Sequence, residues 1–429
     1  MQKLKDIRNR FGTAMPLTES RCDSIFALAV AMLALYGTVM VFSAGYAYAD
    51  FRYGDGFFFV KRQSLWLVMG IAAMLSVSRI DIALLKKHTV KAYCVTLALL
   101  VLTLAIGFVG NGAQRWISIG PITIQPSEIA KLTVAMMLAE YFSSHRSTSL
   151  SNSKRDIFLK GTLIPIVIMA IPIFLVMLQH HLSCIIILGV IGILMIVISG
   201  TDLRYIGAFC LCGLCGVCYI AFFTDYTKDR ITVWLDPESY KLTGGWQTLQ
   251  GLMAIGSGGI FGKGLGRGEL KYCYVSEPAN DMIFAVLCEE LGLVGAIAAL
   301  ALFAILIWRG FVISLGASDI YSKLLGLGIC IKIAVQVLLN VAVVTNTIPN
   351  TGISLPFFSY GGSSLIMIFA EMGILLSISR KSILPTRQKI PNWVSPIPSL
   401  STAICTPNPI KRTPWNTPAV TAYRKCAPS

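Results

Sequence analysis

Asp281 is the carboxylate in this sequence that is best placed for chemistry, because it is the last polar residue before a long apolar segment. It ends the run SEPAND at residues 276–281. An aspartate in that place suits a helix N-cap, since its side chain can accept a hydrogen bond from a free backbone N–H. It also suits a general base that faces basic loops at the mouth of an apolar core. The residues alone leave both interpretations open.

A second polar cluster combines two cations, a carboxylate, an amide and an aromatic ring. Arg115 and Trp116 precede the run QPSEIAK at residues 125–131, which supplies Gln125, Glu128 and Lys131. Glu128 and Lys131 are three residues apart and therefore share one face of a helix. They could form only a local ion pair at a capped helix start. Alternatively, Arg115 and Lys131 bind an anionic head group beside Trp116, since charges within a membrane are costly and usually functional.

Two further segments are rich in glycine and hydroxyl groups. The run AIGSGGIFGKGLG at residues 254–266 is not a P-loop, because no G-K-[ST] closes it. It indicates a re-entrant or surface-lying segment, a phosphate- or sugar-binding surface, or a flexible linker. Farther along, Pro356 and the glycine pair at 361–362 predict a helix broken near its outer end. Ser359 and Ser363 then offer hydroxyls at one depth, as candidate substrate contacts.

Three charged residues lie inside apolar segments and need partners. Glu289 and Glu290 fall about two turns into the segment that follows Asp281. At least one of them is expected to face a polar interior or a partner, since lipid-facing carboxylates are costly. Lys332 is expected either to snorkel toward the membrane surface or to meet a polar partner.

The composition shows what kind of protein must position these residues. The chain has 429 residues, of which 55% are hydrophobic and 13% charged, and its mean hydropathy is +0.71. Soluble domains carry about 25% charged residues, so an ordinary soluble protein is excluded. Apolar stretches of about 18 residues or more, each enough to cross a membrane as a helix, recur along the chain. We therefore predict an all-α, polytopic membrane protein.

About ten transmembrane helices are predicted, which puts both termini on one side. Basic residues concentrate before the first span, between the second and third, between the fourth and fifth, and in the C-terminal tail. All these segments fall on the same side, which is therefore the cytoplasmic one. The predicted spans are residues 24–44, 64–79, 91–109, 127–142, 160–178, 182–199, 204–223, 282–308, 321–345 and 356–379.

The chain divides into three parts. A cytoplasmic N-terminal segment, 1–22, is followed by a ten-helix membrane domain, 23–380, and by a disordered cytoplasmic tail, 381–429, with half of the chain's 18 proline residues. A large extracytoplasmic loop, 224–281, lies between helices 7 and 8 and is expected to fold against the helices.

Charge and cysteine content exclude two other classes of site. A net charge of +15 would suggest nucleic acid in a soluble protein, but in a membrane protein it reflects basic cytoplasmic loops, so no nucleic-acid partner is predicted. The 12 cysteines lie mostly in apolar segments and show no zinc-type pairing with the 4 histidines. No metal ligands are predicted.

Taken together, these segments resemble the SEDS family (shape, elongation, division and sporulation), whose best-known members are FtsW and RodA. The motifs G-A-x-R-W, Q-P-S-E-x-x-K, A-I-G-S-G-G-x-x-G-x-G-L-G, E-E-L-G and L-P-F-x-S-Y-G-G-S-S occur in the family's order between about residues 24 and 380. The run before Asp281 differs from the commoner P-E-A-H-T-D, so a role of a neighbouring histidine does not carry over. Likewise His180-His181-Leu182-Ser183-Cys184 stands where many members have P-D-x-G-T.

The resemblance implies a membrane enzyme that polymerises lipid II into peptidoglycan glycan strands, together with a class B penicillin-binding protein. By this likeness Asp281 matches the family's essential loop aspartate, and Arg115, Trp116 and Lys131 match residues of the outward cavity. Asp281 would then activate an acceptor hydroxyl, and the two cations would hold the departing pyrophosphate. A divalent cation could assist, although the sequence does not show that one binds.

Two other functions remain open at this stage. A lipid II flippase predicts a continuous pathway with polar residues on both faces, and a non-enzymatic scaffold for the transpeptidase predicts that Asp281 can be exchanged without loss of polymer. The segments 247–250 and 357–360 look slightly closer to the FtsW and sporulation branch than to RodA. Growing glycan strand, membrane lipid and the transpeptidase are the partners that the leading interpretation implies.

Overall fold

The computed structural model describes residues 23–110, 113–119, 122–145, 155, 157–201, 204–209, 213, 225–272, 274 and 277–381. Helices dominate it, which confirms the predicted all-α class. The long helices are α2 (Ser24–Tyr53), α3 (Phe58–Val77), α4 (Ile82–Ile106), α5 (Pro126–Ser144), α8 (Ile164–Leu178), α9 (Leu182–Ile198), α13 (Ile283–Leu315), α14 (Ile320–Val344) and α15 (Gly362–Lys381). A π-helical turn, Ile157–Leu163, leads into α8. The helices α11 (Asp225–Leu235) and α12 (Gly245–Gly258) belong to the long loop.

The apolar helices make the chain an integral membrane protein, as predicted. Within the described residues, 7 helices are long and apolar enough to cross a membrane, and α9 is a shorter apolar helix. The predicted seventh span, 204–223, lies largely outside the described residues, so the total of ten spans stays a prediction. The predicted tail, 381–429, lies outside them as well, apart from Lys381.

Several helix boundaries differ from the predicted ones: α4 begins at Ile82 rather than at residue 91, and α13 runs to Leu315 rather than to residue 308. Two further differences have local reasons. The first helix runs to Tyr53 rather than to residue 44, and it ends where Gly54 takes a left-handed conformation with φ of 68°. The last helix begins at Gly362 rather than at residue 356. Before it, Pro356 has no N–H to donate and Phe357 has φ of 66°, so the chain there cannot be helical. The predicted break near the outer end is therefore confirmed.

A small antiparallel sheet, which the sequence pattern did not predict, follows α4. It consists of β1 (Phe108–Gly110), β2 (Ala113–Ile119) and β3 (Ile122–Ile124), in the order β1-β2-β3. Trp116 pairs with Phe108, and Ser118 pairs with Thr123. Strands of three residues are too short to show an alternating pattern. The sheet fixes β2, and with it Arg115 and Trp116, beside the start of α5.

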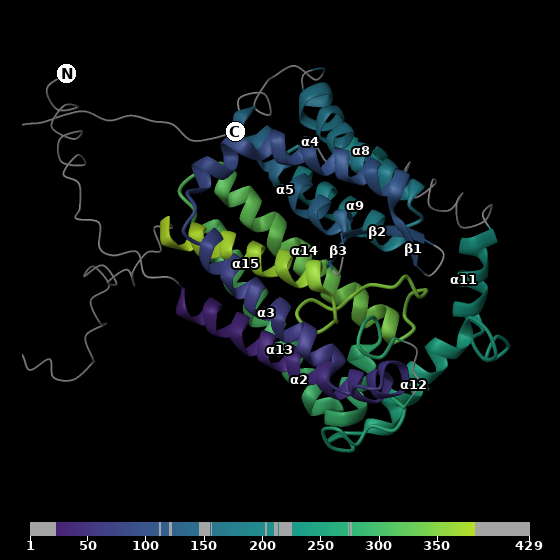
Figure 1. The fold of residues 1–429 in the computed structure, drawn as a ribbon. Helices are drawn as coiled ribbons and strands as arrows, with labels where there is room; N and C mark the ends of the chain where they lie inside the picture. The colour runs from purple at the N-terminus through teal and green to yellow at the C-terminus, as the bar shows by residue number, and fades with distance from the viewer. Residues whose placement is uncertain are drawn as a thin grey trace, which may run out of the picture. The chain divides into compact units, whose positions relative to one another are not determined.

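Different elements gather at the two ends of the helices (Figure 1). The start of α2 and the end of α15 lie together at one end, and the sheet lies with α11 and α12 toward the other. Side chains join the first end: the backbone N–H of Asp23 donates to Ser379 at 3.1 Å, and Lys381 pairs with Asp81 at 2.5 Å. The sequence motifs singled out above thus gather away from the end where the helical part begins and finishes.

The helix α13 is interrupted at Gly292, and backbone hydrogen bonds from the long loop span the interruption. Gly292 has φ of 64° and ψ of −164°, which is not helical, so the N–H groups of Leu293 and Val294 lose their usual helical acceptors at Glu289 and Glu290. The glycine-rich run supplies the missing partners. The four bonds run from Lys263 N to Glu289 O (3.0 Å), Gly264 N to Glu290 O (2.9 Å), Leu293 N to Gly259 O (3.0 Å) and Val294 N to Ile260 O (3.1 Å).

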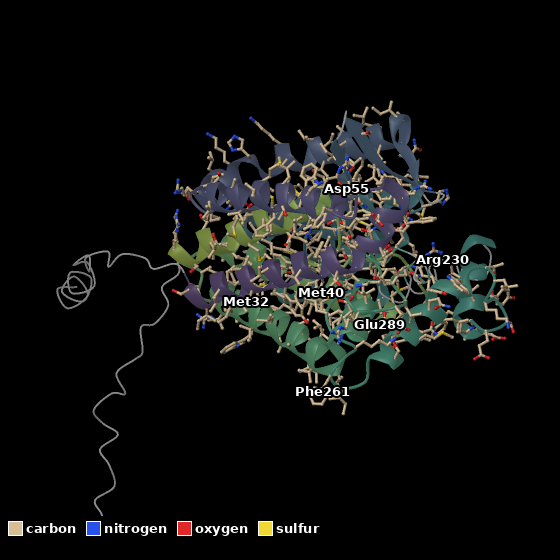
Figure 2. All side chains as sticks on the ribbon, turned by 60° about the horizontal axis from the view of Figure 1, so that its bottom comes forward. Met32, Met40, Asp55, Arg230, Phe261 and Glu289 are labelled. Atoms are coloured by element: carbon tan, nitrogen blue, oxygen red, sulfur yellow. The ribbon has the colours of Figure 1, made fainter. Side chains whose placement is uncertain are left out.

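The side chains of Glu289 and Glu290 are paired in the same place. Lys263 donates to Glu289 at 3.0 Å, and the buried Lys271 donates to Glu290 at 2.6 Å. Ser43 of α2 also donates to Glu290. Figure 2 shows Glu289 on α13 and Phe261 projecting from the surface of the run. The expectation of polar partners for these carboxylates is confirmed, and the glycine-rich run packs as a structural element rather than a flexible linker.

Two glycines of α12 make a matched test of this packing. A Cβ added at Gly258 would lie 1.9 Å from the carbonyl oxygen of Cys288, whereas a Cβ at Gly256 would meet nothing within 4 Å. We expect Gly258→Ala to destabilise the protein by several kcal/mol through that clash. Gly256→Ala should stabilise it slightly, by up to about 1 kcal/mol, because alanine favours the helix. Thermal unfolding in detergent of both variants measures the difference. Equal melting temperatures would contradict the close backbone contact.

Candidate functional site

A polar cavity of about 280 Å³ opens where the sheet meets the helices. It draws on β2, the starts of α5 and α9, α14, the turn before α13 and the two sides of the loop before α15. Because these segments are far apart in sequence, the cavity forms only when the whole helical part has folded. Of the predicted site residues it brings together Arg115, Trp116, Gln125, Glu128, Lys131, Asp281 and Ser363.

An ion pair forms part of the cavity wall. Lys131 donates to Glu128 at 2.6 Å, and both residues are buried. Pro126 occupies the first turn of α5 and places the two side chains one turn apart on the same face. The local ion pair that the sequence offered as one alternative is therefore present, and both of its members line the cavity. Anion binding by Arg115 and Lys131 stays a prediction.

Arg115 and Gln125 are held in the wall by backbone contacts. The guanidinium of Arg115 donates to the carbonyl oxygen of His180 at 2.9 Å, which ties β2 to the turn between α8 and α9. The N–H of Gln125 donates to Ser363 Oγ at 3.3 Å and so joins the start of α5 to the start of α15. Arg115 thereby presents a cation, and Ser363 a hydroxyl, on the same cavity.

The turn that carries Asp281 is fixed by its backbone. Asn340 of α14 donates to the carbonyl oxygens of Asp281 at 3.0 Å and of Ile353 at 2.6 Å. The N–H of Tyr360 donates to the carbonyl oxygen of Ala279 at 2.8 Å. These bonds leave the carboxylate of Asp281 pointing into the cavity. The N-cap position of α13 is Met282, without a side-chain cap, so the N-cap interpretation of Asp281 is wrong.

Ser359 is the predicted site residue that does not line the cavity. Its buried hydroxyl accepts from the N–H of Leu355 at 2.7 Å and donates to the carbonyl oxygen of Asn280 at 2.8 Å. Both bonds hold the loop before α15 against the turn of Asp281. The sequence placed Ser359 correctly near the site, but its hydroxyl supports the wall instead of facing the cavity.

The environment of Asp281 favours its protonated form. Burial raises the pKa of Asp281 to about 6, and the nearby carboxylate of Glu277 adds to the rise. Arg115 and Arg230 act in the opposite direction. A carboxyl group with a pKa near 6 is ionised at neutral pH and is still basic enough to accept a proton during a reaction.

Activity should therefore follow the ionisation of Asp281. A general base works only when deprotonated, so kcat/KM should fall about tenfold per pH unit below about pH 6 and level off above it. Glu277→Gln removes a neighbouring negative charge, so the midpoint should move to lower pH. The measurement is a profile of kcat/KM from pH 4.5 to 8, with thermal unfolding recorded at each pH. A wild-type profile that stays level down to pH 4.5 would contradict the raised pKa of Asp281.

Several cavity residues were not singled out from the sequence as site residues. Gln336 lines the cavity and lies one helical turn before Asn340 on α14. Two amides in an apolar span were the sequence signal that could have indicated a polar site there. His181 is the N-cap residue of α9 and Ser183 lies in its first turn, where the sequence departs from the family pattern. Ser183 donates to the carbonyl oxygen of Thr351 at 2.5 Å and fixes the opposite side of the cavity.

Comparisons with known proteins agree with this architecture. The family described as "Cell cycle protein" (FtsW, RodA and SpoVE) matches residues 23–383. The chain belongs to the FtsW/RodA/SpoVE family. It is similar to Stage V sporulation protein E of Bacillus subtilis (38% identity over 362 residues; 84% of this chain and 97% of the relative). It is also similar to the probable peptidoglycan glycosyltransferase FtsW of Geobacter metallireducens (36% over 363 residues; 84% and 95%).

Solved structures of the FtsW/RodA/SpoVE type share the fold. A chain from the study "Structural coordination of polymerization and crosslinking by a peptidoglycan synthase complex" matches with a TM-score of 0.70 and 26% identity, over 84% of this chain and 98% of that one. The Rod shape determining protein RodA of Thermus thermophilus matches with a TM-score of 0.63 and 25% identity, over 85% and 98%.

Proposed function

We propose that this protein is a peptidoglycan glycosyltransferase that polymerises lipid II in the bacterial cell membrane. The observation that carries the proposal is one cavity that combines a carboxylate of raised pKa, Asp281, with the cations Arg115 and Lys131. Family membership and relatives that are named peptidoglycan glycosyltransferases support it. The chemistry needs these groups, because a sugar must leave its pyrophosphate while an acceptor hydroxyl loses a proton.

In the proposed reaction, Asp281 accepts the proton of the acceptor sugar hydroxyl as that oxygen attacks the anomeric carbon of the lipid-linked strand. A new glycosidic C–O bond forms, the C–O bond to the pyrophosphate breaks, and the polyprenyl pyrophosphate leaves with the bonding electrons. Arg115 stabilises the negative charge that develops on the leaving group. Lys131 adds positive potential at the cavity wall, and its ion pair with Glu128 holds both side chains in place.

The remaining wall residues position the substrate. Trp116 offers a flat apolar face for the sugar or lipid portion, and Ser363 and the amide of Gln125 offer hydrogen bonds. Ser359 acts as a positioning residue through the turn of Asp281. Within the described residues, no group of three or more His, Cys, Asp or Glu side chains is placed to hold a metal ion, and the proposed steps use only the protein's own cations.

The proposed topology puts this cavity outside the cell. Both termini are then cytoplasmic, since the start of α2, the end of α15 and the basic first turns of α4 lie at the end of the helices opposite to the cavity. The long loop, 224–281, is then extracytoplasmic and carries Asp281. Lipid II and the growing strand would reach the cavity from the outer leaflet.

We also propose that the protein works with a class B penicillin-binding protein in the division or sporulation branch. A structural neighbour comes from a study of a peptidoglycan synthase complex. Curated relatives at 38% and 36% identity are a sporulation protein and an FtsW protein, which supports that branch.

The decisive test is polymerisation of lipid II by the purified full chain with its transpeptidase partner, whose crosslinking is blocked with penicillin. We expect glycan strands of many disaccharide units on a gel. A parallel assay in vesicles follows movement of labelled lipid II between leaflets. If lipid II moves between leaflets and no polymer forms, the protein is a flippase instead. If neither activity is found but the transpeptidase binds stably, the protein is a scaffold.

A further inference from the structure

A second cavity lies next to the first and has a different lining. It measures about 520 Å³ and lies between α11, α12 and the chain that follows α14. That volume falls within the range of about 300–1,000 Å³ that is common for small-molecule sites. The lining includes two aromatic rings, three threonine hydroxyls, two amides and one guanidinium, namely Trp234, Tyr240, Thr232, Thr243, Thr248, Gln247, Asn350 and Arg230.

The two cavities share a wall. Arg230 donates to the carbonyl oxygen of Asn350 at 2.5 Å, and Trp234 donates from its indole to the carbonyl oxygen of Asn346 at 2.9 Å. The side chain of Asn350 then accepts from the N–H of Gly352, which lines the first cavity, at 3.2 Å. Arg230, which Figure 2 labels, lies in the middle of α11. Arg230 also acts electrostatically on Asp281.

The lining suits a neutral sugar. A pyranose ring presents apolar C–H faces and polar edges, and the indole and phenol rings match the faces while hydroxyls and amides match the edges. Among the described residues that line this cavity there is no carboxylate and no lysine. The site is therefore unlike the first cavity, which is built around charge, and it has no evident role in the bond-breaking step.

We propose that the second cavity binds an N-acetylated sugar unit of the glycan strand, adjacent to the pair of sugars that reacts. This inference rests on the proposed polymerase function and adds a strand-holding subsite to it. A polymer that occupies the first cavity must extend beyond it, and the shared wall gives it a neighbouring place. Binding there would keep the strand on the enzyme between successive additions.

The test uses the double variant Tyr240→Ala/Gln247→Ala in the full chain with its transpeptidase partner. Tyr240 is 41% exposed, and the matched control is Tyr274→Ala, a tyrosine of the same loop that is 52% exposed and does not line the cavity. We expect shorter strands from the double variant, with nearly unchanged initial consumption of lipid II. The control should give the wild-type strand length. Gln247→Ala alone serves if the double variant melts at a lower temperature.

A binding measurement separates this inference from the polymerase proposal. The probe is a lipid-free tetrasaccharide of alternating N-acetylglucosamine and N-acetylmuramic acid, titrated into an Asp281→Asn protein. The double variant on that background should bind it about tenfold more weakly, since a hydrogen bond and a stacked ring are together worth about 1.4 kcal/mol.

Each failure then has its own meaning. No polymer from the wild-type protein would overturn the polymerase function. The strand-holding subsite alone would be overturned if the double variant made strands of wild-type length. It would also be overturned if the tetrasaccharide did not bind to the protein with the unaltered cavity. Loss of the transpeptidase during purification of the double variant, with unchanged strand length, would also overturn it and assign the cavity to a protein contact.

Discussion

Replacing Asp281 with asparagine should lower the rate of lipid II polymerisation by about 10²–10⁴-fold, the usual contribution of a general base. Asparagine has nearly the same shape, and the turn is held through the backbone carbonyl of Asp281 rather than its side chain. The variant should therefore fold normally and keep its cavity. The measurement is the initial rate of polymer formation at pH 7.5, where the wild-type carboxylate is ionised.

The matched control for this experiment is Asp236→Asn. Asp236 belongs to the same long loop and is exposed, and its carboxylate accepts hydrogen bonds from the nearby Ser239. That variant should retain wild-type activity, and both variants should bind the transpeptidase and melt at the wild-type temperature. Equal polymerisation by wild type and Asp281→Asn would remove Asp281 from the mechanism.

Breaking the buried pair of Lys332 and Glu371 should cost about 3–5 kcal/mol of stability, the largest effect on folding that we expect from a single substitution. Lys332 on α14 donates to Glu371 on α15 at 2.5 Å, and both side chains are almost fully buried. Lys332→Met leaves the buried carboxylate of Glu371 without the cation that bonds to it. The measurement is unfolding in detergent, followed by intrinsic fluorescence.

The double variant Lys332→Met/Glu371→Leu distinguishes loss of a partner from loss of a lysine. Replacing both charges with apolar groups of similar volume is often neutral or stabilising, so the double variant should regain most of the wild-type stability. Lys323→Met, a half-buried lysine near the start of the same helix, should change stability by less than about 0.5 kcal/mol. A double variant as unstable as the single one would show that packing rather than charge sets the cost.

The ion pair and the loop aspartate could be singled out from the sequence because their signals are local. Glu128 and Lys131 share a helix face by spacing alone, and Asp281 stands at a helix mouth that hydropathy reveals. The partner of Lys332 could not be predicted in this way, since Glu371 is 39 residues away and belongs to a different helix. Only the packing of α14 on α15 brings the two charges together.

The orientation of individual side chains was the other feature that could not be predicted from the sequence. Ser359 and Ser363 have the same chemistry and lie four residues apart, yet one supports the loop and the other faces the cavity. The deciding factor is the irregular backbone around Pro356 and Phe357, for which no periodic pattern exists. For the same reason, the three-residue strands beside Arg115 left no signal in the sequence.

The interruption of α13 at Gly292 determines how this protein can be recombined with its relatives. In the sequence the long loop ends at Asp281, just before α13, so that residue would be a natural choice of crossover point for chimeras. Yet the loop donates hydrogen bonds to, and accepts them from, residues as far along as Val294, and Lys263 and Lys271 neutralise carboxylates beyond the apparent boundary. The structural unit that the loop forms therefore extends to Val294, so a graft cut at Asp281 would separate each lysine from the glutamate with which it pairs.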